Sequence, residues 1–121
     1  MLNGFKDYLL DLGKSENTAA AYLRDVKLFL DWCRDSFGDE PKLLHRANVL
    51  EYISYMRNVR GYHPKTVNHH LSSLRSLNEY LITNGRQTEA AVVDSDFMKV
   101  VHVFENFFRK GKEYVVFINI I

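Results

Sequence analysis

The chain has 121 residues, of which 46% are hydrophobic and 26% charged, and its formal net charge is +1. These values predict an ordinary soluble globular protein of one domain, or of one domain with a tail. No apolar run is as long as a membrane span, which needs about eighteen residues, and no secretory signal is evident. The single cysteine, Cys33, excludes an internal disulfide. We therefore expect a cytoplasmic protein with no membrane partner.

Charge is distributed unevenly along the sequence. Residues 1–40 contain five Lys/Arg and eight Asp/Glu, whereas residues 41–80 contain six Lys/Arg, two Asp/Glu and four of the five histidines. A nearly neutral chain can thus present a basic face to an anionic partner. The same charges would also suit a solvated surface with no partner.

Hydrophobic periodicity predicts four helices within residues 1–85. The first contains Phe5, Tyr8, Leu9 and Leu12 at helical spacing, and Gly13 ends it. The second follows a serine whose hydroxyl can cap the first turn. Its predicted inner face comprises Ala19, Tyr22, Val26, Phe29, Leu30 and Cys33, after the cap at Ser15 and before the stop at Gly38.

The third helix is predicted from about Arg46 to Val59, and Gly61 ends it. The fourth begins at Pro64 behind a histidine in the capping position and closes before Gly85. One arc of this helix is apolar and the other is short, polar and mildly basic. The apolar arc contains Val67, His70, Leu71, Leu74, Leu77 and Leu81, and the polar arc contains Lys65, Asn68, His69, Ser72, Arg75, Ser76 and Glu79.

The sequence changes character after Gly85. Residues 86–96 are typical of a linker, residues 97–111 of a helix that is apolar nearly all round, and residues 113–121 of a β-strand with no obvious partner. We expect the apolar side chains of this tail to be buried against another surface.

Metal binding and catalysis are poorly supported. Neighbouring side chains on a helix point about 100° apart, so His69 and His70 cannot both face one ion. We expect His70 to be partly buried and hydrogen-bonded and His69 to lie at the surface. Cys33 lies on an inner face, and no phosphate-binding loop, dinucleotide motif or nucleophile elbow is present. We therefore predict no metal, no cofactor and no catalytic residue.

Two strings of the sequence are distinctive: "GKSENTAAAYLRDVKLFLDWC" and "HPKTVNHHLSSLRSLNEYLI". Both resemble the N-terminal, SAM-like core-binding domain of tyrosine recombinases and phage integrases, and the start "FKDYLLDLG" also fits. The resemblance covers about residues 3 to 85. In the second string the matching residues are Thr66, Val67, Asn68, Leu71, Ser72, Leu74, Arg75, Ser76, Tyr80 and Leu81. His63 departs from the usual capping serine, His69 stands where arginine is common, and Asn78 replaces an aromatic residue.

The resemblance implies an all-α fold, a small four-helix SAM-like bundle of the integrase core-binding type at residues 1–85, with residues 86–121 as a linker and hydrophobic tail of uncertain structure. In that family the bundle forms half of a clamp around DNA, and a separate domain carries the catalytic groups. Only 36 residues (121 − 85) follow Gly85. We therefore expect a DNA-binding module for DNA integration and recombination that lacks a catalytic domain, and Tyr114 does not inherit the nucleophile's role.

The resemblance also implies partners: double-stranded DNA at a recombination site and other recombinase protomers, with no small-molecule substrate. We predict that the DNA-binding residues are Ser15, Asn17, Thr18, Lys65, Thr66, Asn68, His69, Ser72 and Arg75. Lys65 and Arg75 would contact phosphates, the amide of Asn68 could pair with adenine, and His69 would strengthen binding as pH falls. Two alternatives stay open: a helical protein–protein interaction module, and a truncated integrase remnant without function.

Overall fold

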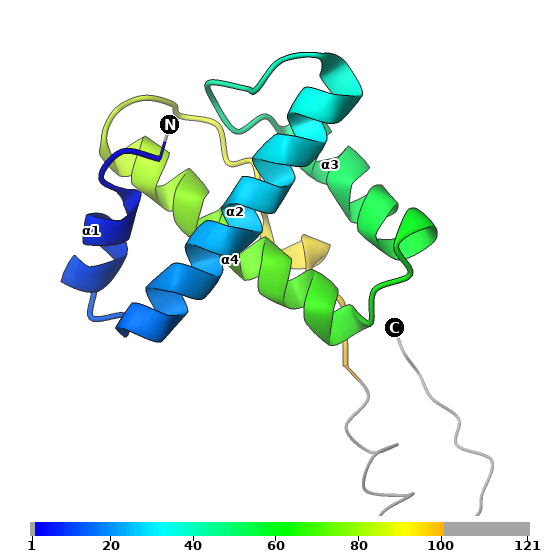
Figure 1. The fold of residues 1–121 in the computed structure, drawn as a ribbon, viewed down its shortest axis with the longest axis horizontal. Helices are drawn as coiled ribbons and strands as arrows, with labels where there is room; N and C mark the ends of the chain where they lie inside the picture. The colour runs from blue at the N-terminus through cyan, green and yellow to red at the C-terminus, as the bar shows by residue number, and fades with distance from the viewer. Residues whose placement is uncertain (1, 101–121) are drawn as a thin grey trace, which may run out of the picture.

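All regular secondary structure in residues 2–100, the part of the chain that the computed structural model describes, is helical, and no strand occurs within these residues (Figure 1). The α-helices are α1 (Phe5–Asp11), α2 (Glu16–Phe37), α3 (Arg46–Ser54) and α4 (Pro64–Thr83). A π-helical turn, η1 (Tyr55–Val59), continues α3, and a 3₁₀ turn, η2 (Asp94–Asp96), follows α4. The predicted all-α class with four helices is confirmed.

The helix ends follow local side-chain chemistry, as predicted. The Ser15 hydroxyl accepts a hydrogen bond from the backbone N–H of Thr18 at 3.1 Å, which caps α2. At the start of α4, Nδ1 of His63 accepts from the N–H of Lys65 at 3.0 Å, so this histidine replaces a serine cap. After α4 the backbone turns at Gly85, whose φ of +71° is a left-handed conformation that favours glycine.

The core lies where α2 and α4 cross, with α1 on one side of the crossing and α3 on the other (Figure 1). Both predicted apolar arcs face it: Phe29 is fully buried and Leu74 is 1% exposed. The other fully buried apolar side chains of the two long helices are Ala19, Val26 and Cys33 in α2 and Val67, Leu71, Leu77 and Leu81 in α4. None of the described helices is long and apolar enough to cross a membrane.

The third helix differs from the prediction of one continuous helix to Val59. The α-helix stops at Ser54, and the N–H of Arg60 then donates to the carbonyl of Tyr55 at 3.0 Å, a bond five residues long. The wider π-turn still buries Met56, so it uses the same apolar position that an α-helix would use. Hydrophobic periodicity cannot distinguish the two over a single turn.

Residues 86–98, which we call the strap, run back along α4 in an extended path. In Figure 1 the strap is the yellow-to-orange segment that turns near the end of α4 and returns toward the start of that helix. The side-chain amide of Asn78 holds its middle: Nδ2 donates to the carbonyl of Glu89 and Oδ1 accepts from the N–H of Ala91, both at 3.0 Å. The sequence predicts a linker over residues 86–96, whereas the structure packs this segment on the bundle.

Further hydrogen bonds fix the two ends of the strap. Near its start, the amide of Gln87 pairs with the N–H and the carbonyl of Leu44 at 2.9 and 3.1 Å. Near its end, the guanidinium of Arg46 binds both carboxylate oxygens of Asp96 at 2.5 and 2.8 Å. A strap side chain thus satisfies both backbone polar groups of Leu44, and an ion pair between two side chains fixes the other end of the strap.

Part of the tail lies outside the described residues. Of the helix predicted over residues 97–111, the first four residues are described and are not helical. The rest of that helix and the strand predicted over residues 113–121 lie outside the described residues. The division of the chain into a domain at residues 1–85 and a separate tail stays a prediction.

Candidate nucleic-acid interface

The polar arc of α4 lies between α2 on one side and the strap on the other. The residues predicted to bind DNA fall into three groups, with Ser72 separate from all three. Lys65, Thr66 and His69 face the side of α2, and Asn68 and Arg75 contact the strap. Ser15, Asn17 and Thr18 form the first turn of α2, and Ser72, half-buried, lies on α4 between the two sides.

An open pocket of about 430 Å³ separates α2 from the first turns of α4. Lys65, Thr66 and His69 share this pocket with Arg24, a residue that is not among the predicted DNA-binding residues. The complete lining consists of Arg24, Asp25, Leu28, Lys65, Thr66, His69 and His70. Two cationic side chains, a hydroxyl and two imidazoles therefore converge from helices that are far apart in the sequence. These are groups that bind phosphate oxygens.

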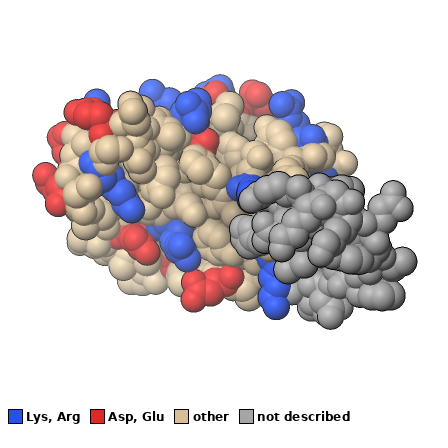
Figure 2. Space-filling model, turned by 90° about the horizontal axis from the view of Figure 1, so that it is seen from below, with Lys and Arg blue, Asp and Glu red and all other residues tan. Residues whose placement is uncertain are grey.

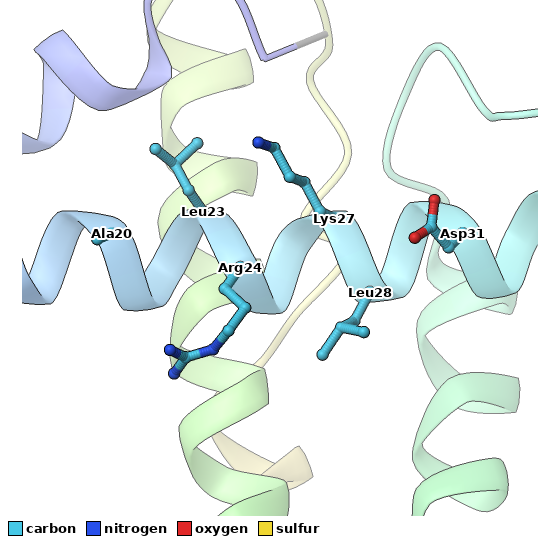
Figure 3. Close-up of a pocket in the computed structure, with 6 residues that line it drawn as sticks. All are labelled: Ala20, Leu23, Arg24, Lys27, Leu28 and Asp31. Carbon is cyan, nitrogen blue, oxygen red and sulfur yellow. The ribbon is translucent and has the colours of Figure 1, made fainter.

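Not every exposed cation of α2 lines this pocket, as the outer face of the helix shows. A shallow groove of about 420 Å³ runs along it, lined by Ala20, Leu23, Arg24, Lys27, Leu28 and Asp31. In Figure 3, Arg24 and Leu28 extend to one side of α2, while Leu23 and Lys27 extend to the other. Arg24 and Leu28 also line the pocket at α4, whereas Lys27 does not. Two cations three residues apart on one helix thus face different surroundings.

A buried carboxylate lies at the inner wall of the pocket. Asp25 is 4% exposed, and its Oδ2 accepts hydrogen bonds from the Ser73 hydroxyl and from Nδ1 of His69, both at 2.7 Å. Because a carboxylate only accepts, Nδ1 of His69 carries the proton in this pair. The other ring nitrogen, Nε2, then becomes a donor only when the imidazole is protonated. Asp25 thereby fixes the orientation and the tautomer of His69, whose side chain is 51% exposed.

His70 lies behind His69 and is buried. Its Nδ1 is 3.6 Å from Oδ1 of Asp25, too far for a hydrogen bond, and has no hydrogen-bond partner within the described residues. The prediction of a hydrogen-bonded His70 is thus wrong for this nitrogen. The ring stacks on Tyr62, with ring centroids 5.6 Å apart. Burial lowers the pKa of His70, against the opposing effect of Asp25, so the imidazole stays neutral to lower pH than an exposed histidine.

The strap occupies two of the predicted DNA-binding residues. Both polar atoms of the Asn68 amide bind the backbone of Met98, at 2.7 Å each. The guanidinium of Arg75 contacts Asp94 at 3.2 Å and lies over the ring of Phe97, 4.4 Å from its centroid. In this conformation Asn68 and Arg75 hold the strap on α4.

At the start of α2, Ser15 and Asn17 are exposed and Thr18 is half-buried, and none of the three lines the pocket. The Ser15 hydroxyl donates to Oγ1 of Thr18 at 3.0 Å in addition to capping the helix. Tyr22, one turn after Thr18, meets the ring of His69 edge-on, with centroids 6.0 Å apart. Through Tyr22 the start of α2 is therefore connected to the α4 side of the pocket.

Charge on the described surface is mixed. On the face seen in Figure 2, Lys and Arg side chains are interspersed with Asp and Glu and separated by uncharged residues. Anion binding on this face would thus depend on local groups of cations rather than on a continuous basic surface.

Other chemistry finds little support among residues 2–100. These residues include no group of three or more His, Cys, Asp or Glu side chains that could hold a metal ion. Cys33 is fully buried, and burial raises the pKa of its thiol to about 11, so the reactive thiolate is disfavoured.

Comparison with known proteins supports the resemblance seen in the sequence. Residues 1–86 match the family model described as "Phage integrase, N-terminal SAM-like domain". The chain belongs to this family. The predicted SAM-like fold is thereby confirmed for the bundle, since the matched residues contain all four helices, α1 to α4.

Curated relatives of the SAM-like domain are longer recombination proteins. The TnP I resolvase of Bacillus thuringiensis is 37% identical over 100 residues, covering 83% of this chain and 35% of the resolvase. The tyrosine recombinase XerD of Listeria monocytogenes serotype 4b (strain F2365) is 26% identical over 101 residues, covering 82% of this chain and 34% of that recombinase. The chain thus spans about a third of the length of these relatives. No solved structure matches it.

Proposed function

We propose that this SAM-like domain binds duplex DNA in the cytoplasm, as part of site-specific recombination, through the facing surfaces of α2 and α4. The observation that carries the proposal is the pocket in which Arg24, Lys65, Thr66 and His69 converge between these helices. Membership of the phage integrase family and similarity to a resolvase and a tyrosine recombinase support it. The partner is the DNA backbone, since cationic and hydroxyl side chains bind phosphates of any sequence.

Base reading by Asn68 has an additional requirement. An asparagine amide can pair with adenine in the major groove. In this structure, however, both hydrogen bonds of the amide go to Met98. Contact between Asn68 and a base therefore requires the end of the strap to leave α4. With the strap in place, the domain would position DNA by its backbone and contribute little sequence specificity through this residue.

A salt titration of duplex binding tests the proposal. Each phosphate contact that releases a counterion contributes about −0.9 to the slope of log Kobs against log salt concentration. Lys65→Ala should make the slope shallower by about 1 and weaken binding to all duplex sequences to a similar extent. The control is Lys42→Ala, which removes an exposed lysine from the loop after α2 and should leave the slope unchanged.

Two results would contradict DNA binding at this surface. One is a wild-type chain with no salt-dependent affinity for duplex DNA, which would favour a protein–protein interaction module. The other is an equal slope for Lys65→Ala, Lys42→Ala and wild type, which would place the DNA on a different face.

We propose further that residues 1–121 hold DNA without cutting it. The matched segment is about a third of the relatives' length, and the pocket lining includes neither tyrosine nor cysteine. Incubation with a nicked suicide duplex, which traps covalent intermediates, should yield no protein–DNA adduct. An adduct, at Tyr114 in particular, would show that the chain carries out strand cleavage.

A further inference from the structure

The inner wall of the pocket is unusual for a merely solvated surface. Asp25 is almost completely buried, and the neighbouring Nδ1 of His70 is buried without a hydrogen-bond partner among the described residues. Nearly all buried polar groups in proteins are hydrogen-bonded, so an unsatisfied one beside a cationic pocket calls for an explanation. A water or an ion bound beside such a group is one explanation.

We propose that this pocket seats one phosphate group of the DNA backbone, between Arg24 of α2 and Lys65 of α4, and that Asp25 positions His69 to donate to the same phosphate when its imidazole is protonated. This inference rests on the proposed function and specifies it. It assigns Arg24 to the interface, makes Asp25 a positioning residue, and makes the affinity of this one contact dependent on pH.

The geometry supports one seat rather than scattered contacts. Arg24 and Lys65 come from different helices and line the same pocket together with the Thr66 hydroxyl. A guanidinium presents several N–H groups to phosphate oxygens, a lysine adds a point charge, and a hydroxyl can donate a further hydrogen bond. A phosphate held by these groups would contact α2 and α4 simultaneously. The relative position of the two helices therefore determines how well the seat fits.

His69 adds a contact that depends on its protonation. Its Nδ1 is bound to Asp25 at 2.7 Å, so the ring cannot turn freely to present that nitrogen to a ligand. Only Nε2 remains for an anion, and Nε2 repels a phosphate oxygen as a lone pair but attracts it as an N–H. The Ser73 hydroxyl, also at 2.7 Å from Oδ2 of Asp25, helps to hold the carboxylate in place.

Charged and titratable groups of α2, α3 and α4, and Tyr62 before α4, surround the histidine pair. Arg24 and Asp25 of α2 and Lys65 of α4 leave one positive charge in excess when both histidines are neutral. Protonation of His69 adds a second. The neighbours without formal charge are Tyr22 of α2, which contacts His69, and Tyr52 of α3 and Tyr62 before α4, which contact His70.

The first experiment compares Arg24→Ala with Lys27→Ala in the full chain of 121 residues, using a duplex of arbitrary sequence as the probe. Both residues are exposed cations of α2, but only Arg24 lines the pocket. Arg24→Ala should make the salt slope shallower by about 1, whereas Lys27→Ala should leave it unchanged. Equal slopes for the two variants, with wild-type binding intact, would overturn the phosphate seat but not DNA binding by the domain.

The second experiment measures affinity at constant salt from about pH 8 to about pH 6, the range in which histidine side chains take up a proton. Wild-type affinity should rise several-fold as pH falls. His69→Gln can still donate to Asp25 but cannot be protonated, so it should lose most of this rise in affinity. The control His45→Gln, at the exposed start of α3, should keep the full rise in affinity as pH falls. An unchanged pH response in His69→Gln would overturn the role of His69 in the seat. Absence of duplex binding by wild type at every pH would reject the seat together with the proposed function.

Discussion

Asn78 is the residue whose removal should test the strap most directly. Its side chain is 3% exposed and makes one hydrogen bond to the carbonyl of Glu89 and one to the N–H of Ala91. Asn78→Ala removes both, at about 0.5 to 1.5 kcal/mol each, and leaves the buried N–H of Ala91 without a partner, which costs about 1 to 3 kcal/mol. Because these contributions overlap, we expect a total loss of about 2 to 4 kcal/mol in the free energy of unfolding.

Urea unfolding followed by circular dichroism measures this loss. The matched control is Asn58→Ala, which removes an exposed amide bonded to the Ser54 hydroxyl at 3.1 Å and should change stability by less than about 0.5 kcal/mol. Hydrogen exchange at the amide of Ala91 provides a second measurement, since this amide should exchange faster in Asn78→Ala. Equal stability of the two variants, with unchanged exchange at Ala91, would refute the conclusion that Asn78 holds the strap.

Two further predictions concern the core and the Arg46–Asp96 pair. Leu74→Ala should lower the free energy of unfolding by about 2 to 5 kcal/mol, because Leu74 is 1% exposed between α2 and α4, whereas Leu28→Ala, at a position 47% exposed, should cost less than about 1 kcal/mol. A cost below about 0.5 kcal/mol for Leu74→Ala would contradict its assignment to the core. Hydrogen bonding to Arg46 lowers the pKa of Asp96, so Asp96 stabilises the fold above its unfolded pKa of about 3.9, and this contribution is lost as pH falls through its lower folded pKa. The stability difference between wild type and Asp96→Asn should therefore shrink from about pH 5 to about pH 2 in urea titrations, and a difference independent of pH would contradict the role of the ionised pair.

Local chemistry made most of the bundle predictable. The Ser15 cap, the His63–Pro64 start of α4 and the turn at Gly85 each depend on residues close together in the sequence, and all three occur in the structure. The apolar arcs of α2 and α4 were predictable for a similar reason, since helical periodicity identifies a buried face without knowledge of its partner. For these features the sequence neighbourhood contains nearly all of the necessary information.

The pocket and the strap were not predictable in the same way. From the sequence, Asp25 would be assigned to the charged, exposed face of its helix. Its partner His69 lies 44 residues away. Arg24 lies on the exposed side of α2, but the sequence does not indicate which neighbours it meets there. Asn78 and Gln87 are polar and would ordinarily be assigned to the surface. Their burial depends on backbone groups of a distant segment, which periodicity does not report.

The strap also determines how far from α4 the chain after it can reach. A flexible segment of about 13 residues would have a root-mean-square end-to-end distance of about 20 Å and would leave its far end free to explore that volume. Here the far end is fixed, because Asn68 binds both backbone polar groups of Met98 beside the first turns of α4. Whatever follows Met98 therefore begins from a defined point close to the proposed DNA surface, with a higher effective concentration there than a loose tether would provide. Substitutions that release the strap would lengthen the tether without adding a residue.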